Sequence, residues 1–157
     1  TINQVRKISG ELRPHLLDEL GLIAAIEKHV EEFGKRSGIS CHLIAQVRKI
    51  NVERNYSVGI FRILQEALTN VMRHANASSV FVRILKNKEL ISMEIEDDGI
   101  GFDERLMDAQ GPEGRGLGLE TMKGRCQMVG GVLKIWTKEG EGTRITLNIP
   151  VERGTTH

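Results

Sequence analysis

Hydrophobic residues recur every three or four positions in several stretches of the chain, and this spacing predicts amphipathic helices. The expected main helices span residues 20–36, 56–75 and 117–129. The second has the most regular apolar face, made of Ile60, Ile63, Leu64, Ala67, Leu68, Val71, Met72 and Ala75. A shorter helical pattern covers residues 2–12 and ends before Pro14. We expect the polar residues 51–55 to cap the helix that follows them.

Shorter apolar or alternating segments between these helices predict strands. They cover residues 40–47, 79–85, 90–95, 132–137 and 143–149. The second and third strands are joined by a hairpin turn, and so are the fourth and fifth. Hairpins beside helices predict an α+β fold, a two-layer α/β sandwich whose mixed, mostly antiparallel sheet is covered by helices on one face. A doubly wound sheet would need strict alternation of strands and helices, which this order lacks.

Composition narrows the classes of function. A length of 157 residues suits a single domain, and a net charge of +1 gives no indication of nucleic acid as a partner. The longest run without Asp, Glu, Lys or Arg is 11 residues, and it contains His42, so we expect no membrane span and no direct membrane contact. The two cysteines form no CxxC pair, which argues against a zinc knuckle or a disulfide scaffold. The expected compartment is the reducing cytoplasm.

Polar side chains line one edge of the long helix expected at residues 56–75. Glu66, Asn70 and His74 are four residues apart and advance only about 40° each around the helix, and Arg73 falls beside Glu66. A solvated helix flank explains a glutamate in such a position. A mid-helix asparagine at the edge of the core is less ordinary, because asparagine is a mediocre helix former. Together these side chains could supply a base, a hard oxygen ligand and a phosphate donor.

Glycines cluster in the second half of the chain, around three further polar sites. Asp97, Gly99 and Gly101 follow an apolar strand, where an Asp-Gly turn is one interpretation. The other is a carboxylate at a strand end that accepts a hydrogen bond from the amino group of a planar ligand. The segment 114–119 opens a helix with three glycines, and its bare N–H groups suit a phosphate. It matches neither a dinucleotide fingerprint nor a Walker A loop. Gly142 precedes the last strand, as a tight hairpin would require.

The order and spacing of these four blocks resemble the ATP-binding fold of the GHKL superfamily (the Bergerat fold), which includes DNA gyrase, the ninety-kilodalton heat-shock chaperone, histidine kinases and MutL. The resemblance spans about residues 47–150. Within it, residues 63–75 are similar to sensor histidine kinases of the nitrate-sensor and DesK-like group, and so are residues 12–22, with Leu-Arg-Pro ahead of Asp-Glu-Leu-Gly-Leu. The short lid expected at residues 103–113 also suits this group, whose partners are LuxR-type response regulators.

The resemblance implies a role for each block. Asp97 would accept the adenine amino hydrogen, with Thr143 assisting through a water molecule. Asn70 would bind the Mg²⁺ ion that bridges the phosphates of ATP, and Glu66 holds the position proposed as the general base. The remaining implied nucleotide contacts are Arg73, His74, Gly99, Gly101, Gly114, Gly116, Leu117 and Gly118.

The activity implied for the whole protein is transfer of the ATP γ-phosphoryl to a histidine on a dimerisation domain, and then to an aspartate of a response regulator. None of the five histidines (His15, His29, His42, His74 and His157) has the context of the family's phosphoacceptor. We therefore expect residues 1–20 to be the end of the dimerisation and phosphoacceptor helix and its connector, 21–151 the ATP-binding domain, and 152–157 a disordered tail. Homodimers would form through the missing domain, and this chain alone would be monomeric.

Two other functions stay open for the same fold. A serine kinase of the anti-sigma-factor type is a free-standing domain, which the connector-like segment 12–22 disfavours. A non-catalytic nucleotide-binding interaction module could have lost both Glu66 and Asn70, yet both are present.

Overall fold

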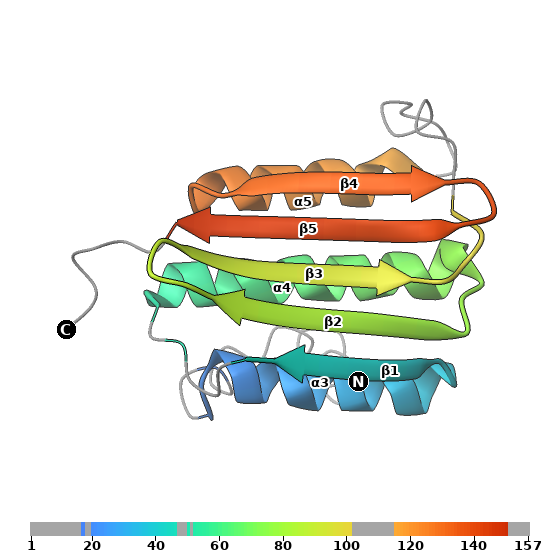
Figure 1. The fold of residues 1–157 in the computed structure, drawn as a ribbon, viewed down its shortest axis with the longest axis horizontal. Coiled ribbons are helices and arrows are strands. Elements are labelled where there is room, and N and C mark those ends of the chain that lie inside the picture. The colour runs from blue at the N-terminus through green and yellow to red at the C-terminus, as the bar shows by residue number, and fades with distance from the viewer. Residues whose placement is uncertain (1–16, 18–19, 47–49, 51, 102–114, 151–157) are drawn as a thin grey trace, which may run out of the picture.

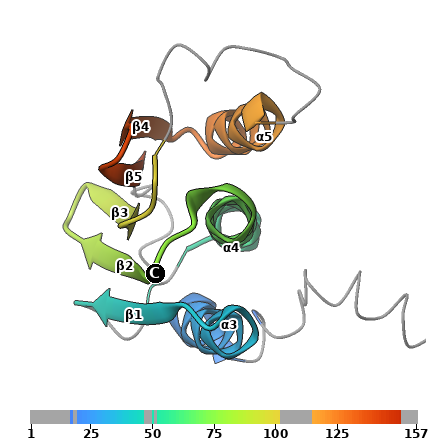
Figure 2. The same ribbon diagram turned by 90° about the vertical axis from the view of Figure 1, so that its right-hand side faces the viewer.

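A computed structural model describes residues 17, 20–46, 50, 52–101 and 115–150. Within them one mixed sheet carries helices on a single face, as Figures 1 and 2 show. The elements are α3 (Leu22–Ser37), β1 (Ser40–Ala45), α4 (Arg54–Asn70), η1 (Val71–Ala75), β2 (Ser79–Lys86), β3 (Leu90–Asp97), α5 (Arg115–Met128), β4 (Val132–Lys138) and β5 (Gly142–Pro150). The predicted α+β sandwich is confirmed.

The strands of the sheet lie in the order β1-β2-β3-β5-β4. β1 and β2 are parallel, because the helix α4 connects them and returns the chain to the same end of the sheet. The pairs β2–β3, β3–β5 and β4–β5 are antiparallel. β3 ends, and β5 begins, at the same end of the sheet as the end of α4 (Figure 1).

The core lies between the sheet and the three helices. Buried residues alternate along β3 and along most of β2 and β5, as the alternating sequence pattern predicts. The largest fully buried side chains are Ile26, Ile60, Ile63, Leu64, Leu68, Ile84, Met93, Met122, Leu147, Ile149, Val80 and Val82. Gly59 lets α4 approach the residue that follows α5, since a Cβ there would lie 3.0 Å from Val129 Cγ1. This packing fixes the long helix against the sheet, and thereby the polar edge of that helix.

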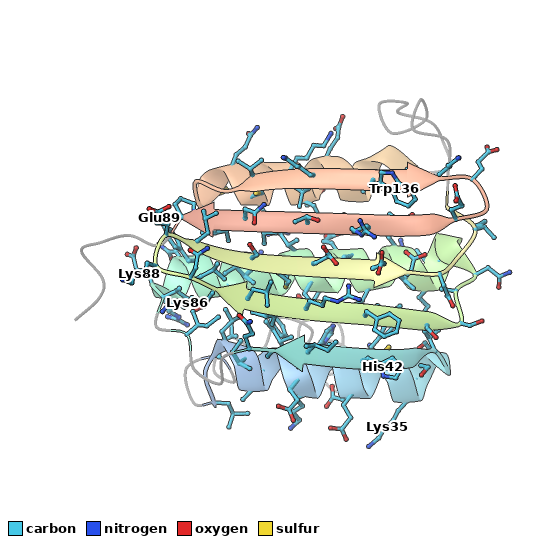
Figure 3. All side chains as sticks on the ribbon, viewed as in Figure 1. Lys35, His42, Lys86, Lys88, Glu89 and Trp136 are labelled. Carbon is cyan, nitrogen blue, oxygen red and sulfur yellow. The ribbon has the colours of Figure 1, made fainter. Side chains whose placement is uncertain are left out.

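The other face of the sheet carries polar and aromatic side chains, with His42 on β1 and Trp136 on β4 labelled in Figure 3. Arg144 donates to Glu96 from Nε (2.9 Å) and from Nη2 (2.5 Å), and its guanidinium lies 5.8 Å from the centre of the Trp136 ring. These hydrogen bonds from Arg144 lower the pKa of Glu96. Exposed pairs of this kind contribute little to stability, because solvent screens them. They support the register of the sheet.

The structure differs from the predicted elements at the long helix. It begins at Arg54, within the segment expected to cap it, and Glu53 at its N-cap makes no side-chain capping hydrogen bond. Its last turn, Val71–Ala75, is a π-helix and not a continuation of the α-helix. The predicted helix at 2–12, the lid at 103–113 and the tail at 152–157 lie outside the described residues.

Candidate functional site

The four sequence blocks meet at one end of the sandwich, at the right of Figure 1. The end of α4, the end of β3, the turn between β4 and β5 and the start of α5 all lie there. Segments far apart in the sequence therefore surround one region, as the hypothesis of a single nucleotide site requires.

Asp97 is the last residue of β3 and only 7% exposed. Its Oδ1 accepts a hydrogen bond from the backbone N–H of Gly99 at 2.9 Å. Burial raises the pKa of this carboxyl, against the lowering effect of that N–H, and the neighbouring charge of Asp98 raises it further. A carboxylate has about four lone-pair sites, so Asp97 keeps acceptor capacity for a donor such as an amino group.

Thr143 faces Asp97 across the sheet as its register partner on β5. The Thr143 hydroxyl lies 3.0 Å from the hydroxyl of Thr137, which in turn donates to the Gly142 carbonyl oxygen at 3.2 Å. Thr137 is 3% exposed and was not singled out from the sequence. Because its one proton goes to Gly142, Thr143 donates in the contact between the two hydroxyls. The Thr143 oxygen is then left to accept a hydrogen bond, for instance from water.

Two of the glycines serve packing of the backbone. Gly142 has φ +87°, and a Cβ on it would overlap the carbonyl oxygen of Asp97. Gly101 has φ +64°, and a Cβ there would overlap the carbonyl oxygen of Lys138. The Gly140 N–H also donates to the Ile100 carbonyl at 2.6 Å. The loop after β3 and the β4–β5 turn are thus locked together, a reason for these glycines that the sequence alone did not reveal.

Glu66 and Asn70 lie on α4 and are both half-buried. Arg73 and His74 lie on η1, where Arg73 is exposed. The 40° steps expected from Glu66 to His74 hold for an α-helix, but a π-helical turn has more residues per turn. The 40° steps therefore apply from Glu66 to Asn70, and the alignment of Arg73 and His74 with them stays a prediction. Single π-helical turns are rare and occur frequently at functional sites.

The helix α5 begins at Arg115, so Gly116, Leu117 and Gly118 form its first turn. The first four N–H groups of a helix have no hydrogen-bond partner within the helix. They give its N-terminal end a partial positive charge, where an anion binds well. Gly114 lies outside the described residues. Among the residues the structure describes, no cluster of three histidine, cysteine or acidic side chains could hold a metal ion by itself. No described helix is long and apolar enough to cross a membrane.

Sequence reasoning missed one acidic residue in this region. Asp98 is exposed, and its carboxylate accepts hydrogen bonds from the backbone N–H groups of Ser78 and Ser79. Ser78 lies between η1 and β2, and Ser79 is the first residue of β2. The Asp-Asp-Gly sequence does show a second acidic residue. It does not show which backbone N–H groups the side chain of that residue contacts.

Two solved histidine kinases have a similar fold. The blue-light activated histidine kinase of Erythrobacter litoralis EL346 matches with a TM-score of 0.75 and 24% identity, over 99% of this chain and 52% of that one. The Acinetobacter baumannii histidine kinase AdeS matches with a TM-score of 0.66 and 17% identity, over 97% of this chain and 82% of that one.

Two curated relatives are more similar in sequence. The oxygen sensor histidine kinase NreB of Staphylococcus carnosus (strain TM300) is 34% identical over 150 residues, which are 96% of this chain and 42% of that protein. The signal transduction histidine-protein kinase/phosphatase DegS of Brevibacillus brevis is 36% identical over 151 residues, 96% of this chain and 38% of that protein. This chain thus spans about two-fifths of each relative.

The family model of histidine kinase-, DNA gyrase B-, and HSP90-like ATPases matches residues 55–153, more than half of the chain. That segment runs from the start of α4 to beyond β5 and includes each of the four blocks. The chain belongs to this family of histidine kinase-, DNA gyrase B-, and HSP90-like ATPases.

Proposed function

We propose that this chain binds Mg²⁺-ATP and works as the catalytic part of a two-component sensor histidine kinase. In this proposal the γ-phosphoryl of ATP passes to a histidine on a dimerisation domain outside this sequence, and then to an aspartate of a LuxR-type response regulator. The carrying observation is the convergence of a buried carboxylate, a polar helix edge and a helix N-terminus at one end of the sheet.

The adenine end of the site is assigned to Asp97. Its carboxylate is buried, is oriented by the Gly99 N–H and has acceptor capacity left. A buried carboxylate that is not fully satisfied is costly. Adenine presents an amino group that could meet this need, whereas guanine presents a carbonyl oxygen at the same position.

The phosphate end is assigned to α4, η1 and the start of α5. Mg²⁺ binds in proteins through one or two oxygen ligands together with substrate phosphates and water, which the side-chain amide oxygen of Asn70 fits. The N–H groups of residues 115–118 suit the phosphates, together with Arg73. When bound, Mg²⁺ would neutralise phosphate charge during transfer.

Glu66 is the candidate general base, one turn before Asn70 on the same edge of α4. In this role it would take the proton from the attacking histidine nitrogen as the new bond to phosphorus forms and the bond to ADP breaks. Phosphoryl transfer depends mostly on positioning and charge neutralisation, so a base adds to catalysis without being needed for nucleotide binding.

The test is phosphorylation in trans. The chain is mixed with Mg²⁺, γ-labelled ATP and the separately produced dimerisation domain of its own longer protein. We expect acid-labile label on the added domain and none on the chain. Label that stays absent from the added domain, or that is acid-stable and on serine, would contradict the proposal.

A further inference from the structure

The region between the two ends of the site contains a carboxylate to which the nucleotide assignment gives no role. Asp98 Oδ1 accepts hydrogen bonds from the backbone N–H of Ser78 (2.8 Å) and of Ser79 (2.9 Å). The Asp98 N–H donates back to the Ser79 carbonyl oxygen at 3.3 Å. Two adjacent acidic residues thus differ in role, because Asp97 is buried while Asp98 holds a separate segment of backbone.

The segment that Asp98 holds follows η1, on the phosphate side of the proposed site, along the chain. Residues 76–78 connect η1 to β2, which begins at Ser79, and Asn76 adopts the left-handed conformation with φ +48°. The Ser78 carbonyl oxygen also accepts from the Ser40 N–H on β1 at 3.0 Å. Asp98 therefore ties the loop after β3 to the start of β2 and to the short connection, residues 76–78, that leads from the helix end carrying Asn70.

We propose that Asp98 is a positioning residue that holds the phosphate side of the site, Asn70 and η1, at a set separation from the adenine acceptor Asp97. This inference rests on the proposed function, since it assumes that one nucleotide contacts both sides. Hydrogen bonds to a carboxylate are stronger than those between neutral groups, so two of them fix the segment firmly. Misplacement of binding groups by about 1 Å is enough to weaken the action of a site strongly.

The expected signature is a loss of coupling between adenine and phosphate recognition. Without the Asp98 oxygen, Asp97 keeps its own bond to Gly99 and should still accept the amino group of adenosine. ADP must also contact Asn70 and the start of α5. It should therefore lose much of the affinity that its phosphates add over adenosine. A residue that only stabilises the fold would change both ligands alike.

The chain offers a matched control at the opposite end of the sheet. Asn87 Oδ1 accepts from the backbone N–H groups of Glu89 (2.8 Å) and Leu90 (2.7 Å), the same two-bond arrangement in the β2–β3 hairpin. Figure 3 labels Glu89 at that hairpin, far from the ends of α4 and β3. Asn87→Ala removes equivalent bonds away from the proposed site.

The experiment measures the dissociation constants of Mg²⁺-ADP and of adenosine for the wild-type chain and its variants, by calorimetry and NMR titration. We expect Asp98→Ala to weaken Mg²⁺-ADP about tenfold and adenosine less than about twofold. Asn87→Ala should change neither, and Asp98→Asn, which keeps an acceptor oxygen, should recover most of the Mg²⁺-ADP affinity. Should Asp98→Ala unfold, Asp98→Glu keeps the charge and displaces it by one methylene, and it should also lower the preference for Mg²⁺-ADP.

The outcomes separate this inference from the proposed function. A wild-type chain that binds Mg²⁺-ADP no better than adenosine would overturn the proposed function. A wild-type chain that prefers Mg²⁺-ADP, with Asp98 variants that keep the full preference or lose both ligands equally, would overturn only the positioning role. In an Asn70→Ala background the Asp98→Ala change should have little further effect on Mg²⁺-ADP, and simple additivity would also count against the inference.

Discussion

Substitution of Asp97, the buried carboxylate at the end of β3, separates its effect on ADP affinity from its effect on the stability of the fold. Asp97→Asn keeps the shape of the side chain and an oxygen that can accept from the Gly99 N–H, now 2.9 Å from Oδ1. Asp97→Ala removes the acceptor altogether and leaves the N–H of the buried Gly99 without it. Asp97→Asn removes only the charge. Asp97→Ala removes the charge and also the hydrogen-bond acceptor of a backbone N–H.

The magnitudes follow from the burial of this residue. A hydrogen bond to a charged group contributes about 1.5–3 kcal/mol and a neutral one about 1 kcal/mol. Asp97→Asn should therefore weaken ADP about 2- to 30-fold, and Asp97→Ala, at about 2–3 kcal/mol, about 30- to 150-fold. Loss of the acceptor for Gly99 should also lower the free energy of unfolding of the alanine variant by about 1–3 kcal/mol.

Asp97→Asn, unlike Asp97→Ala, should not lower the free energy of unfolding at neutral pH. Because burial raises the pKa of Asp97 above its ordinary value of 3.8, the folded chain binds this proton more tightly than the unfolded chain does. The wild-type chain therefore loses stability relative to Asp97→Asn as the pH rises from about 3.8 through the raised pKa, and at neutral pH the variant should be within about 1 kcal/mol of wild type or above it.

Urea unfolding at several pH values, together with calorimetric titration with ADP, measures both quantities on the same samples. Asp97→Asn should lose affinity without losing stability, and Asp97→Ala should lose both. If Asp97→Asn binds ADP as tightly as wild type, the role of Asp97 as a charged acceptor for adenine is refuted. One that is destabilised as much as the alanine variant would show that the carboxylate serves the fold.

Other substitutions and conditions test the remaining parts of the site. Glu66→Gln should leave ADP affinity within about twofold but lower phosphotransfer to an added dimerisation domain by about 10²-fold or more, and equal losses in both assays would make Glu66 structural. Gly142→Ala should destabilise the chain by about 2 kcal/mol more than Gly38→Ala in thermal unfolding, since both have positive φ but only the first Cβ would overlap backbone; equal effects would contradict this packing. In binding titrations from neutral to acidic pH, ADP affinity should fall at a higher pH than an ordinary aspartate would give, because protonation of Asp97 removes the charged acceptor, and an affinity that is flat down to pH 4 would contradict this role.

The sandwich could be predicted because its signals are local and repeated. The three-and-four spacing of Ile60, Ile63 and Leu64 and the alternation in β2 and β3 are enough to assign faces, and the structure buries these faces. The location of the site could be predicted for another reason: four blocks of polar and glycine residues at set spacings resemble one known family. The roles of their individual residues stay predictions.

What the sequence could not show depends on contacts across the fold. The reason for Gly101 is the Lys138 carbonyl of a distant turn, and the hydrogen bonds of Asp98 reach Ser78 and Ser79 in another segment. The π-helical turn after Asn70 also escaped: the 3.6-residue period places Met72 on the apolar face, whereas the structure leaves it 54% exposed.

The most direct test of the central claim is a calorimetric titration of this chain with Mg²⁺-ATP and, in parallel, with Mg²⁺-GTP. The account predicts one ATP bound per chain and GTP bound at least about tenfold more weakly, because Asp97 accepts a hydrogen bond that the guanine carbonyl cannot donate. Absence of binding at millimolar ATP, or equal affinity for the two nucleotides, would contradict it.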